Sequence, residues 1–292
     1  MFDRISAFFD KTVVYGRMIK FSHTLFALPF ALAAVVLAHR VSPLNARTLF
    51  WIIMAMVGAR SAAMGFNRLA DASIDARNPR TAGREIPSGA ISVKEAAVFV
   101  SAFALIFILS AAMLSPLCLW LSFPALGVLF AYSYTKRFTW LSHIVLGLAI
   151  GMAPAAVWIA MTGTLSAGIL VLSLALLTYI AGFDILYACQ DTEFDRREKL
   201  CSIPAVFGIE RAFAISSGLH VVSAICLLSV YWLFDLSAIY LVFAGIIAVL
   251  FLVEHRLVNP RNLSKIDIAF FHVNTVISVL VFVAVLSGEL LR

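Results

Sequence analysis

Apolar residues form long runs along this chain that polar residues rarely interrupt. Two of these runs, 96–115 and 212–234, contain no Asp, Glu, Lys or Arg and are long enough to cross the hydrocarbon core of a bilayer as helices. A helix satisfies its own backbone hydrogen bonds, so it is the expected structure of such a run in lipid. The pattern predicts nine helices, at about residues 22–39, 48–67, 94–114, 117–133, 140–161, 167–188, 210–232, 235–254 and 267–289.

The composition of the chain agrees with this prediction. Of the 292 residues, 62% are hydrophobic and 13% are charged, whereas a soluble domain carries about 25% charged residues. Too few polar side chains are present to cover a water-facing surface, which excludes a soluble globular fold. The sequence therefore predicts an all-α protein, a polytopic transmembrane helical bundle that forms a single domain over residues 1–292.

Lys and Arg residues are divided unequally between the two sides of the predicted bundle. If the N-terminus is cytoplasmic, 18 of the 22 lie on the cytoplasmic side and three on the other, while one lies within a helix. This division follows the positive-inside rule. It predicts a multi-pass protein of the bacterial inner membrane whose cytoplasmic parts include an amphipathic N-terminal segment, 1–20, and two long polar loops, 68–93 and 189–209. Topology and attraction to anionic lipid then explain the net charge of +6, and nucleic acid is not expected as a partner.

The first polar loop begins with a regularly spaced set of polar side chains. Asn67, Asp71 and Asp75 recur every four residues, so on a helix they project from one face. Carboxylates are costly to desolvate next to a bilayer. A divalent cation removes that cost, and Mg²⁺ typically takes one or two carboxylates together with water and phosphate oxygens. The alternative is a solvated helix end whose acids are balanced by Arg68 and Arg77.

The second polar loop repeats this pattern and favours the metal-binding alternative. Asp184, Tyr187, Asp191 and Asp195 are spaced to share a helical face, and the last two repeat the four-residue spacing of the first loop 120 residues later in the chain. Both acidic pairs follow even-numbered predicted helices. The repetition predicts two similar halves around a central cavity, with two Mg²⁺ ions that hold a diphosphate between the acidic pairs.

Four basic residues are candidates for binding anions. Arg84, Lys136 and Arg137 lie on the predicted cytoplasmic side and could neutralise diphosphate oxygens as a C–O bond ionises, although positive-inside topology alone would also place them there. Arg60 lies seven residues before Asn67, on the same helical face and inside the bilayer. An unpaired charge there costs about 2.5–3.5 kcal/mol, so Arg60 is expected to face the cavity and to pair with a carboxylate or an acidic substrate.

The remaining polar and small residues within the helices indicate packing. The six histidines show no metal-ligand spacing and are expected to be polar residues between helices or at the interface. His23, beside the cytoplasmic face, is the one histidine with a candidate substrate contact. Gly147 and Gly151 indicate close approach of the 140–161 helix to a neighbour.

The two loops resemble the signature motifs of the UbiA superfamily of intramembrane prenyltransferases. The Asn67–Asp71–Asp75 spacing resembles the first motif, and the Asp184–Tyr187–Asp191–Asp195 spacing resembles the second. The sequences around 84–89 and 202–204 also look familial. The stretches 21–29 and 78–82 resemble the 4-hydroxybenzoate polyprenyltransferase branch, which includes relatives that prenylate a dihydroxynaphthoate.

This resemblance implies a reaction and a role for each candidate residue. A polyprenyl group would pass from polyprenyl diphosphate to a hydroxylated aromatic acid in ubiquinone or menaquinone biosynthesis. Mg²⁺ on the four motif aspartates and Asn67 would hold the diphosphate, and the three cytoplasmic basic residues would help to carry its charge. Tyr187 or an acid of the second motif would stabilise the allylic cation or assist proton loss, and Asp184 would help to bind the substrate. Many relatives have Asn-Asp where this chain has Asn67-Arg68, but residue 68 lies off the shared face.

Two other kinds of function compete with this interpretation. Within the prenyltransferases, the acceptor could instead be of the haem, chlorophyllide or glyceryl phosphate type. A secondary transporter would use acidic residues as ion sites, but transporters place these near the bilayer midplane on broken helices. The acids of this chain cluster at one predicted membrane edge, which favours the enzyme.

Overall fold

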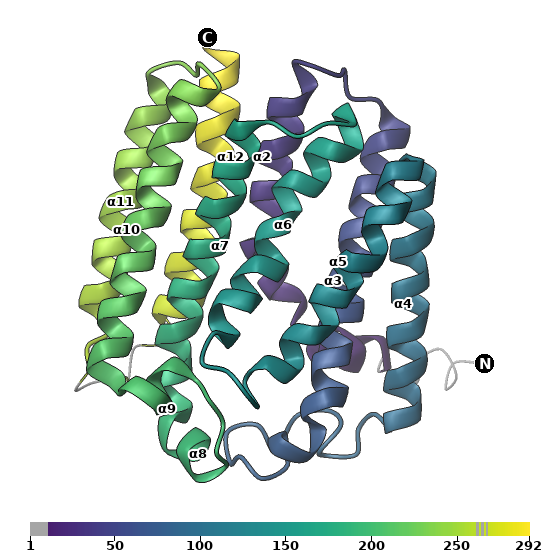
Figure 1. The fold of residues 1–292 in the computed structure, drawn as a ribbon, viewed down its shortest axis with the longest axis vertical. Helices are drawn as coiled ribbons and strands as arrows, with labels where there is room; N and C mark the ends of the chain where they lie inside the picture. Colours follow the sequence, from purple (N-terminus) through teal and green to yellow (C-terminus); the bar gives the residue numbers. More distant parts are fainter. Residues whose placement is uncertain (1–10, 261–262, 264–265, 267) are drawn as a thin grey trace. The chain divides into compact units, whose positions relative to one another are not determined.

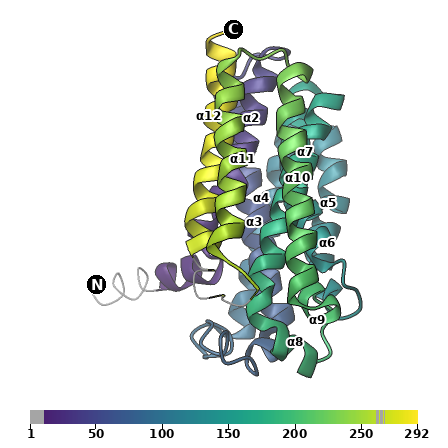
Figure 2. The same cartoon turned by 90° about the vertical axis from the view of Figure 1, so that its left-hand side faces the viewer.

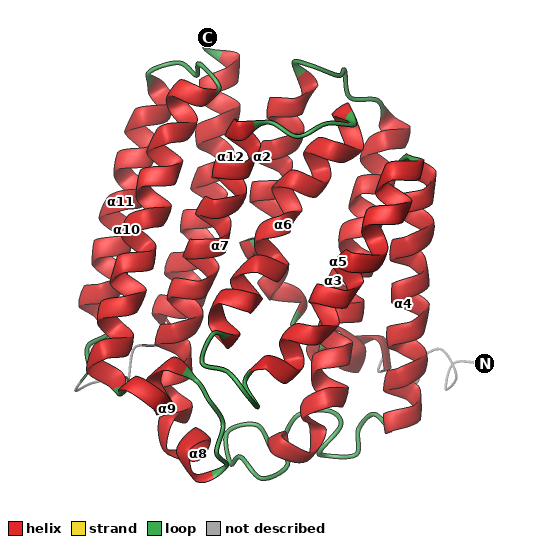
Figure 3. Cartoon of the chain, viewed as in Figure 1, coloured by secondary structure: helices red, strands yellow, loops and turns green. Residues whose placement is uncertain are grey.

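The computed structural model describes residues 11–260, 263, 266 and 268–292. Within these residues the chain is helical and contains no strand, which confirms the predicted all-α class (Figure 3). Residues 1–10 of the amphipathic segment 1–20 lie outside the described residues. Arg4, Arg261 and Lys265, which contributed to the predicted charge division, and the side chain of His23 also lie outside them.

Apolar helices occupy all nine predicted positions in the described part of the chain. They are α2 (Leu28–His39), α3 (Ala46–Asp75), α4 (Val93–Leu114), α5 (Pro116–Thr135), α6 (Ser142–Thr162), α7 (Ala167–Ala188), α10 (Ile209–Leu233), α11 (Ile239–Leu257) and α12 (Asn274–Leu290) (Figure 1). Eight apolar helices are long enough to cross a membrane, whereas the first, over Thr24–His39, is shorter. The protein is a multi-pass membrane protein, and the orientation of its loops stays a prediction.

Short helical segments fill the connections on which the motifs lie. A 3₁₀ segment, η1 (Phe21–Phe26), precedes α2, and a π-helical turn, η3 (Ile268–Val273), precedes α12. After α7 the chain continues as a 3₁₀ turn, η2 (Cys189–Asp191), and two short helices, α8 (Thr192–Arg197) and α9 (Ile203–Phe207). The second predicted loop is therefore largely helical.

The described chain divides into two compact units. The first comprises residues 11–24 and 50–134. Within it, α3 packs closely against α4 at Gly58, where an added Cβ would lie 2.7 Å from the backbone nitrogen of Phe107. The rings of Phe66 on α3 and Phe130 on α5 stack with centroids 4.3 Å apart. The helix that carries the first motif, α3, thus packs against both α4 and α5.

The second unit comprises residues 25–49 and 135–292, and α7 is its most buried helix. Helices α6 and α10 pack on α7, and α11 packs beside α12 (Figure 2). An added Cβ at Gly147 would lie 2.4 Å from the carbonyl oxygen of Leu177, and one at Gly151 would lie 2.8 Å from the Cβ of Leu177. The predicted close packing of these two glycines is therefore confirmed, and α7 is the neighbour.

Histidines lie between the helices of the second unit, as predicted for packing residues. His143 on α6 and His220 on α10 are both buried. His220 lies against Gly182 of α7, where an added Cβ would meet its ring at 2.4 Å, and its Nδ1 lies 3.1 Å from Nε2 of His255 on α11. The two helices that pack on α7, α6 and α10, thus each carry a buried histidine.

Candidate functional site

The first motif occupies the last three turns of α3. The helix continues eight residues beyond its predicted end at 67, so Asn67, Asp71 and Asp75 lie on one helix, as their spacing requires. The side-chain amide of Asn67 donates a hydrogen bond to Oδ2 of Asp71 over 2.9 Å. The amide oxygen of Asn67 is then left as the acceptor on this group, and the pair presents the oxygen ligands that Mg²⁺ prefers.

The loop after α3 folds back onto its end and brings Arg84 to Asp75. Thr81 donates from its hydroxyl to the Asp75 carbonyl over 3.1 Å, which closes the first turn of the loop. Nη1 of Arg84 then lies 2.7 Å from each carboxylate oxygen of Asp75, a side chain that is only 8% exposed. A cation is favoured and a carboxylate disfavoured at a helix C-terminus, so the arginine offsets the charge that the motif places there.

Two arginines of α3 bind the helix at residues 11–18 and the turn that follows it. Nη2 of Arg60 donates to the carbonyl of Lys20 over 2.9 Å, and Nε of Arg68 donates to that of Met18 over 3.2 Å. The last carbonyls of a helix have no partner within it, so they accept such bonds readily. The expected carboxylate or acidic partner of Arg60 is thus replaced, among the described residues, by backbone oxygens. Nε of Arg60 is buried and has no hydrogen-bond partner in the described part of the chain.

The second motif begins on α7 and continues through η2 into α8. The 3₁₀ turn has three residues per turn and breaks the expected continuous helical face. Asp191 and Asp195 are both buried. Each carboxylate oxygen of Asp195 has a contact: Oδ1 forms an ion pair with Nζ of Lys136 at 2.8 Å, and Oδ2 accepts a hydrogen bond from the Ser202 hydroxyl over 2.6 Å.

The turn at residues 198–202 brings these three groups together. The backbone N–H of Leu200 donates to the carbonyl of Asp195 over 2.8 Å, and that of Cys201 donates to the carbonyl of Lys136 over 2.7 Å. Ser202 is the N-cap of α9 and accepts from the Ala205 N–H. One hydroxyl therefore both caps a helix and fixes a motif carboxylate.

Asp184, the first acid of the second motif, contacts a residue that sequence reasoning treated only as a packing residue. Nδ1 of His143 lies 2.6 Å from Oδ2 of Asp184. Their separation of 41 positions in the chain leaves no local spacing signal for this pair. Of the other candidates in this unit, Tyr187 is half-buried on α7 and Arg137 is exposed beyond α5, and their roles stay predictions.

The two motifs share one arrangement. In each, a carboxylate predicted to hold a metal forms an ion pair with a basic residue predicted to bind diphosphate: Asp75 with Arg84, and Asp195 with Lys136. In the described part of the chain, no cluster of three or more His, Cys, Asp or Glu could hold a metal alone. Mg²⁺ needs only one or two carboxylates when phosphate and water complete its shell, so the oxygen donors of each motif fit that ion.

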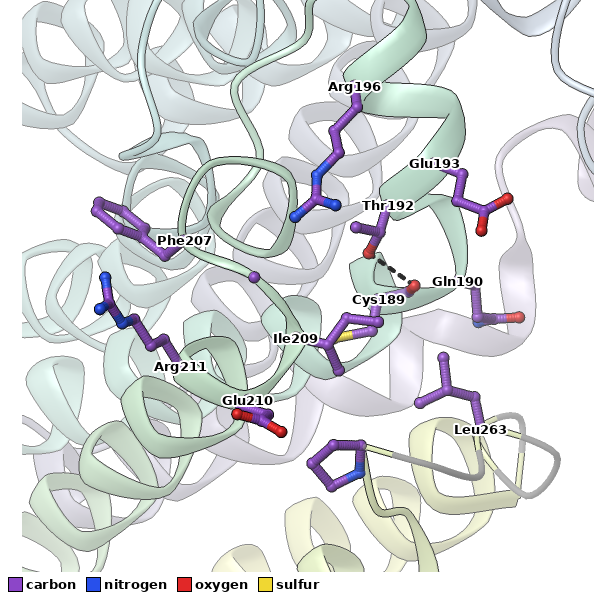
Figure 4. Close-up of a pocket in the computed structure, with 12 residues that line it drawn as sticks. Cys189, Gln190, Thr192, Glu193, Arg196, Phe207, Ile209, Glu210, Arg211 and Leu263 are labelled. Carbon is purple, nitrogen blue, oxygen red and sulfur yellow. Dashed lines mark hydrogen bonds between the residues drawn. The ribbon is translucent and has the colours of Figure 1, made fainter.

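A pocket of about 860 Å³ lies beside the second motif in the same unit. Thr192, Glu193 and Arg196 line one part of it and Arg211 another, as Figure 4 shows. The Thr192 hydroxyl donates to the carbonyl of Cys189 over 2.9 Å. None of the predicted site residues lines this pocket, although Gln190 and Thr192, on either side of Asp191, do.

The fold and the two acidic motifs define a helical membrane protein, and comparisons identify its family. The sequence model of the UbiA prenyltransferase family matches residues 27–276. The chain belongs to this family.

Individual relatives agree with this assignment. The 4-hydroxybenzoate octaprenyltransferase of Sodalis glossinidius is 32% identical over 244 residues, which is 83% of each chain. A UbiA homolog from Aeropyrum pernix K1 superposes with a TM-score of 0.82 at 30% identity, covering 90% of this chain and 97% of that one. A UbiA homolog from Archaeoglobus fulgidus bound to GPP and Mg²⁺ shares the fold, with a TM-score of 0.70 at 20% identity, covering 93% and 99% of the two chains.

Proposed function

We propose that this protein transfers a polyprenyl group from polyprenyl diphosphate to 4-hydroxybenzoate at the cytoplasmic side of the bacterial inner membrane. The observation that carries the proposal is the ion pair of a motif carboxylate and a basic residue in each acidic motif of a UbiA-family chain. The relative from Sodalis glossinidius supports 4-hydroxybenzoate as the acceptor. A dihydroxynaphthoate is the second acceptor to test, because the sequence also resembles that branch.

The first step is departure of the diphosphate. Asp71, Asp75, Asp191 and Asp195, with Asn67, would hold Mg²⁺, which when bound offsets the negative charge of the diphosphate. The chain itself supplies Arg84, Lys136 and Arg137 to the leaving oxygens as the C–O bond breaks and its electron pair departs. Arg84 and Lys136 are already fixed by their carboxylates at 2.7 and 2.8 Å. Charges held in place before the reaction need no reorganisation as the leaving group forms.

The second step joins the allylic carbon to the ring. The ring carbon ortho to the hydroxyl attacks the allylic cation, and the proton on that carbon must then leave. Asp184 suits this proton better than Asp195, because its side chain is 25% exposed and His143 bonds only one of its oxygens, whereas the Asp195 side chain is 1% exposed and has a contact on each oxygen. Tyr187, three residues further along α7, is assigned to stabilise the cation.

The acceptor is tested directly with purified protein in lipid vesicles. With Mg²⁺ and octaprenyl diphosphate, 4-hydroxybenzoate should gain one prenyl group ortho to the hydroxyl, detected by mass spectrometry. A dihydroxynaphthoate and glyceryl phosphate, offered in parallel, should react at least about tenfold more slowly, since each tenfold preference requires only about 1.4 kcal/mol of differential transition-state binding. Transfer to glyceryl phosphate alone would replace the proposed acceptor.

Arg60 is proposed to bind the carboxylate of the acceptor. Its buried Nε has no hydrogen-bond partner among the described residues, and an aromatic carboxylate needs a cation if it is buried. Arg60→Ala should raise the KM for 4-hydroxybenzoate by about 10- to 100-fold, which corresponds to the loss of one charged hydrogen bond. The KM for the prenyl diphosphate should change less.

Arg137→Ala should instead raise the KM for the prenyl diphosphate more than the KM for 4-hydroxybenzoate. Arg60→Lys is the matched control for folding, because its ammonium can still bond the carbonyls of Ile19 and Lys20; equal effects on both substrates would leave Arg60 a structural residue.

A further inference from the structure

The side chain of His143, on α6, contacts both α7 and the first residue of α9. Its side chain is only 4% exposed. Nδ1 faces the Asp184 carboxylate at 2.6 Å, and Nε2 lies 3.3 Å from the backbone nitrogen of Ile203. Both ring nitrogens are therefore engaged.

The close packing of α6 on α7 is what brings the imidazole to Asp184. Gly147 lies one helical turn after His143 on the same side of α6, and its missing side chain lets the helix approach the Leu177 carbonyl. Gly151 repeats the contact one turn later. The histidine thus lies at the end of a tightly packed interface, where its ring has little freedom to move.

The contact with Ile203 fixes which nitrogen carries the proton. A backbone N–H can only donate, so Nε2 must be the acceptor in this bond. The neutral ring then carries its hydrogen on Nδ1 and donates it to Oδ2 of Asp184. A second proton on Nε2 would break the bond to Ile203, so the ring is suited to hold Asp184 rather than to accept a proton itself.

The same turn connects His143 to the other end of the second motif. Ile203 follows Ser202, whose hydroxyl donates to Asp195, and Asp195 pairs with Lys136. The adjacent residues Ser202 and Ile203 therefore bond Asp195 and the His143 ring that contacts Asp184, respectively. A shift of this turn would move both.

We propose that His143 is a positioning residue for prenyl transfer: it holds Oδ2 of Asp184 so that Oδ1 faces the ring carbon that loses its proton. This inference rests on the proposed function. As the new C–C bond forms, the C–H bond of that carbon breaks, its electron pair restores the aromatic ring, and the proton passes to Oδ1. His143 keeps its own proton throughout.

The test compares variants at residue 143 in the vesicle assay with 4-hydroxybenzoate. His143→Leu should lower kcat by about 30-fold, part of the 10²–10⁴ that positioned proton transfer contributes, with both KM values changed less than about threefold. His143→Asn places an amide N–H near the position of Nδ1 and should recover most of kcat. His143→Gln places its amide near Nε2 instead and should not.

Coupling to Asp184 separates positioning from general packing. In an Asp184→Asn background, His143→Leu should cause no further loss of kcat, because the carboxylate it holds is gone. His220→Asn is the matched control: it is also a buried histidine on a neighbour of α7, it does not bond Asp184, and kcat should be unchanged.

Each outcome of these assays decides between the proposals. A wild-type protein that prenylates none of the aromatic acceptors overturns the proposed function and this inference together. An active wild type with equal kcat in His143→Leu, or with additive losses in the double variant, overturns the positioning role alone. If His143→Leu does not fold, the Asn and Gln variants decide: equal kcat values for the two contradict the proposal.

Discussion

Asp71→Asn and Asp191→Asn are each expected to lower prenyl transfer by at least about 10³-fold, because a positioned charge at a reacting phosphate contributes several kcal/mol. The amide keeps the shape of the carboxylate, and in Asp71→Asn it can still accept from Asn67, which donates to Oδ2 at 2.9 Å in the native chain. What it loses is the negative charge that a divalent cation requires. EDTA should abolish transfer by the native protein, and Mg²⁺ should restore it.

The measurement needs a readout besides activity. Binding of prenyl diphosphate should raise the melting temperature of the native protein only when Mg²⁺ is present, since a ligand that binds the folded state alone stabilises it. Both Asn variants should lose this shift. Glu193→Gln is the control, because Glu193 is an exposed acid between the two motif aspartates that lines the neighbouring pocket. Full transfer by the native protein in metal-free vesicles would contradict metal-dependent binding of the diphosphate.

The sequence predicted the helices well because lipid leaves a run of apolar residues few alternatives. Nine runs gave nine helices in the described chain, although the first is shorter than a membrane span. The clearest error was the end of α3, predicted at 67 and observed at Asp75. The long apolar run ends where the motif begins, but the backbone continues as a helix. Leu69 and Ala72, which lie between the polar positions of the motif, still pack against a small apolar cluster that includes Met18 and Ile86.

The spacing of the first motif correctly predicted that its acids share a helix, whereas the single helical face expected for the second motif is broken by η2. Neither spacing predicted which residues would contact the acids. Asn67 and Asp71 are i and i+4 on one helix, so their contact follows from the period alone. The pairs Asp195–Lys136 and Asp184–His143 join residues far apart in the chain. They depend on how α6, α7 and the turn before α9 pack, and a single sequence carries no signal for that.

For Arg60, the sequence provided a reason to expect a partner but did not identify that partner. Its predicted position inside the bilayer led us to expect a charged partner, since a lone charge there is costly. Because Arg60 shares the helical face of Asn67, we expected that partner to be a carboxylate or an acidic substrate. The end of the 11–18 helix and the turn after it supply backbone carbonyls instead, and a short amphipathic helix with no motif gives no reason to place its last turn against α3.

Lys136→Met is expected to lower both stability and transfer, and a second substitution should separate the two effects. Asp195 is fully buried, and Lys136 is its one ion-pair partner among the described residues, together with the Ser202 hydroxyl. Removing the lysine leaves a buried carboxylate without its cation, which costs about 3 kcal/mol or more. Thermal unfolding in detergent should show a lower melting temperature for this variant and a nearly native one for Lys136→Arg.

The double variant Lys136→Met/Asp195→Asn removes both charges and should recover most of the lost melting temperature, because the amide can still accept from Ser202 and no charge remains unpaired. If Lys136 and Asp195 act on the diphosphate and its metal, this stable protein should still transfer the prenyl group at least about 10²-fold more slowly than the native chain. A stable double variant with native turnover would mean that the pair only holds α8 against the 135–136 turn. In that case the basic residues that carry the diphosphate charge would have to be sought at Arg84 and Arg137.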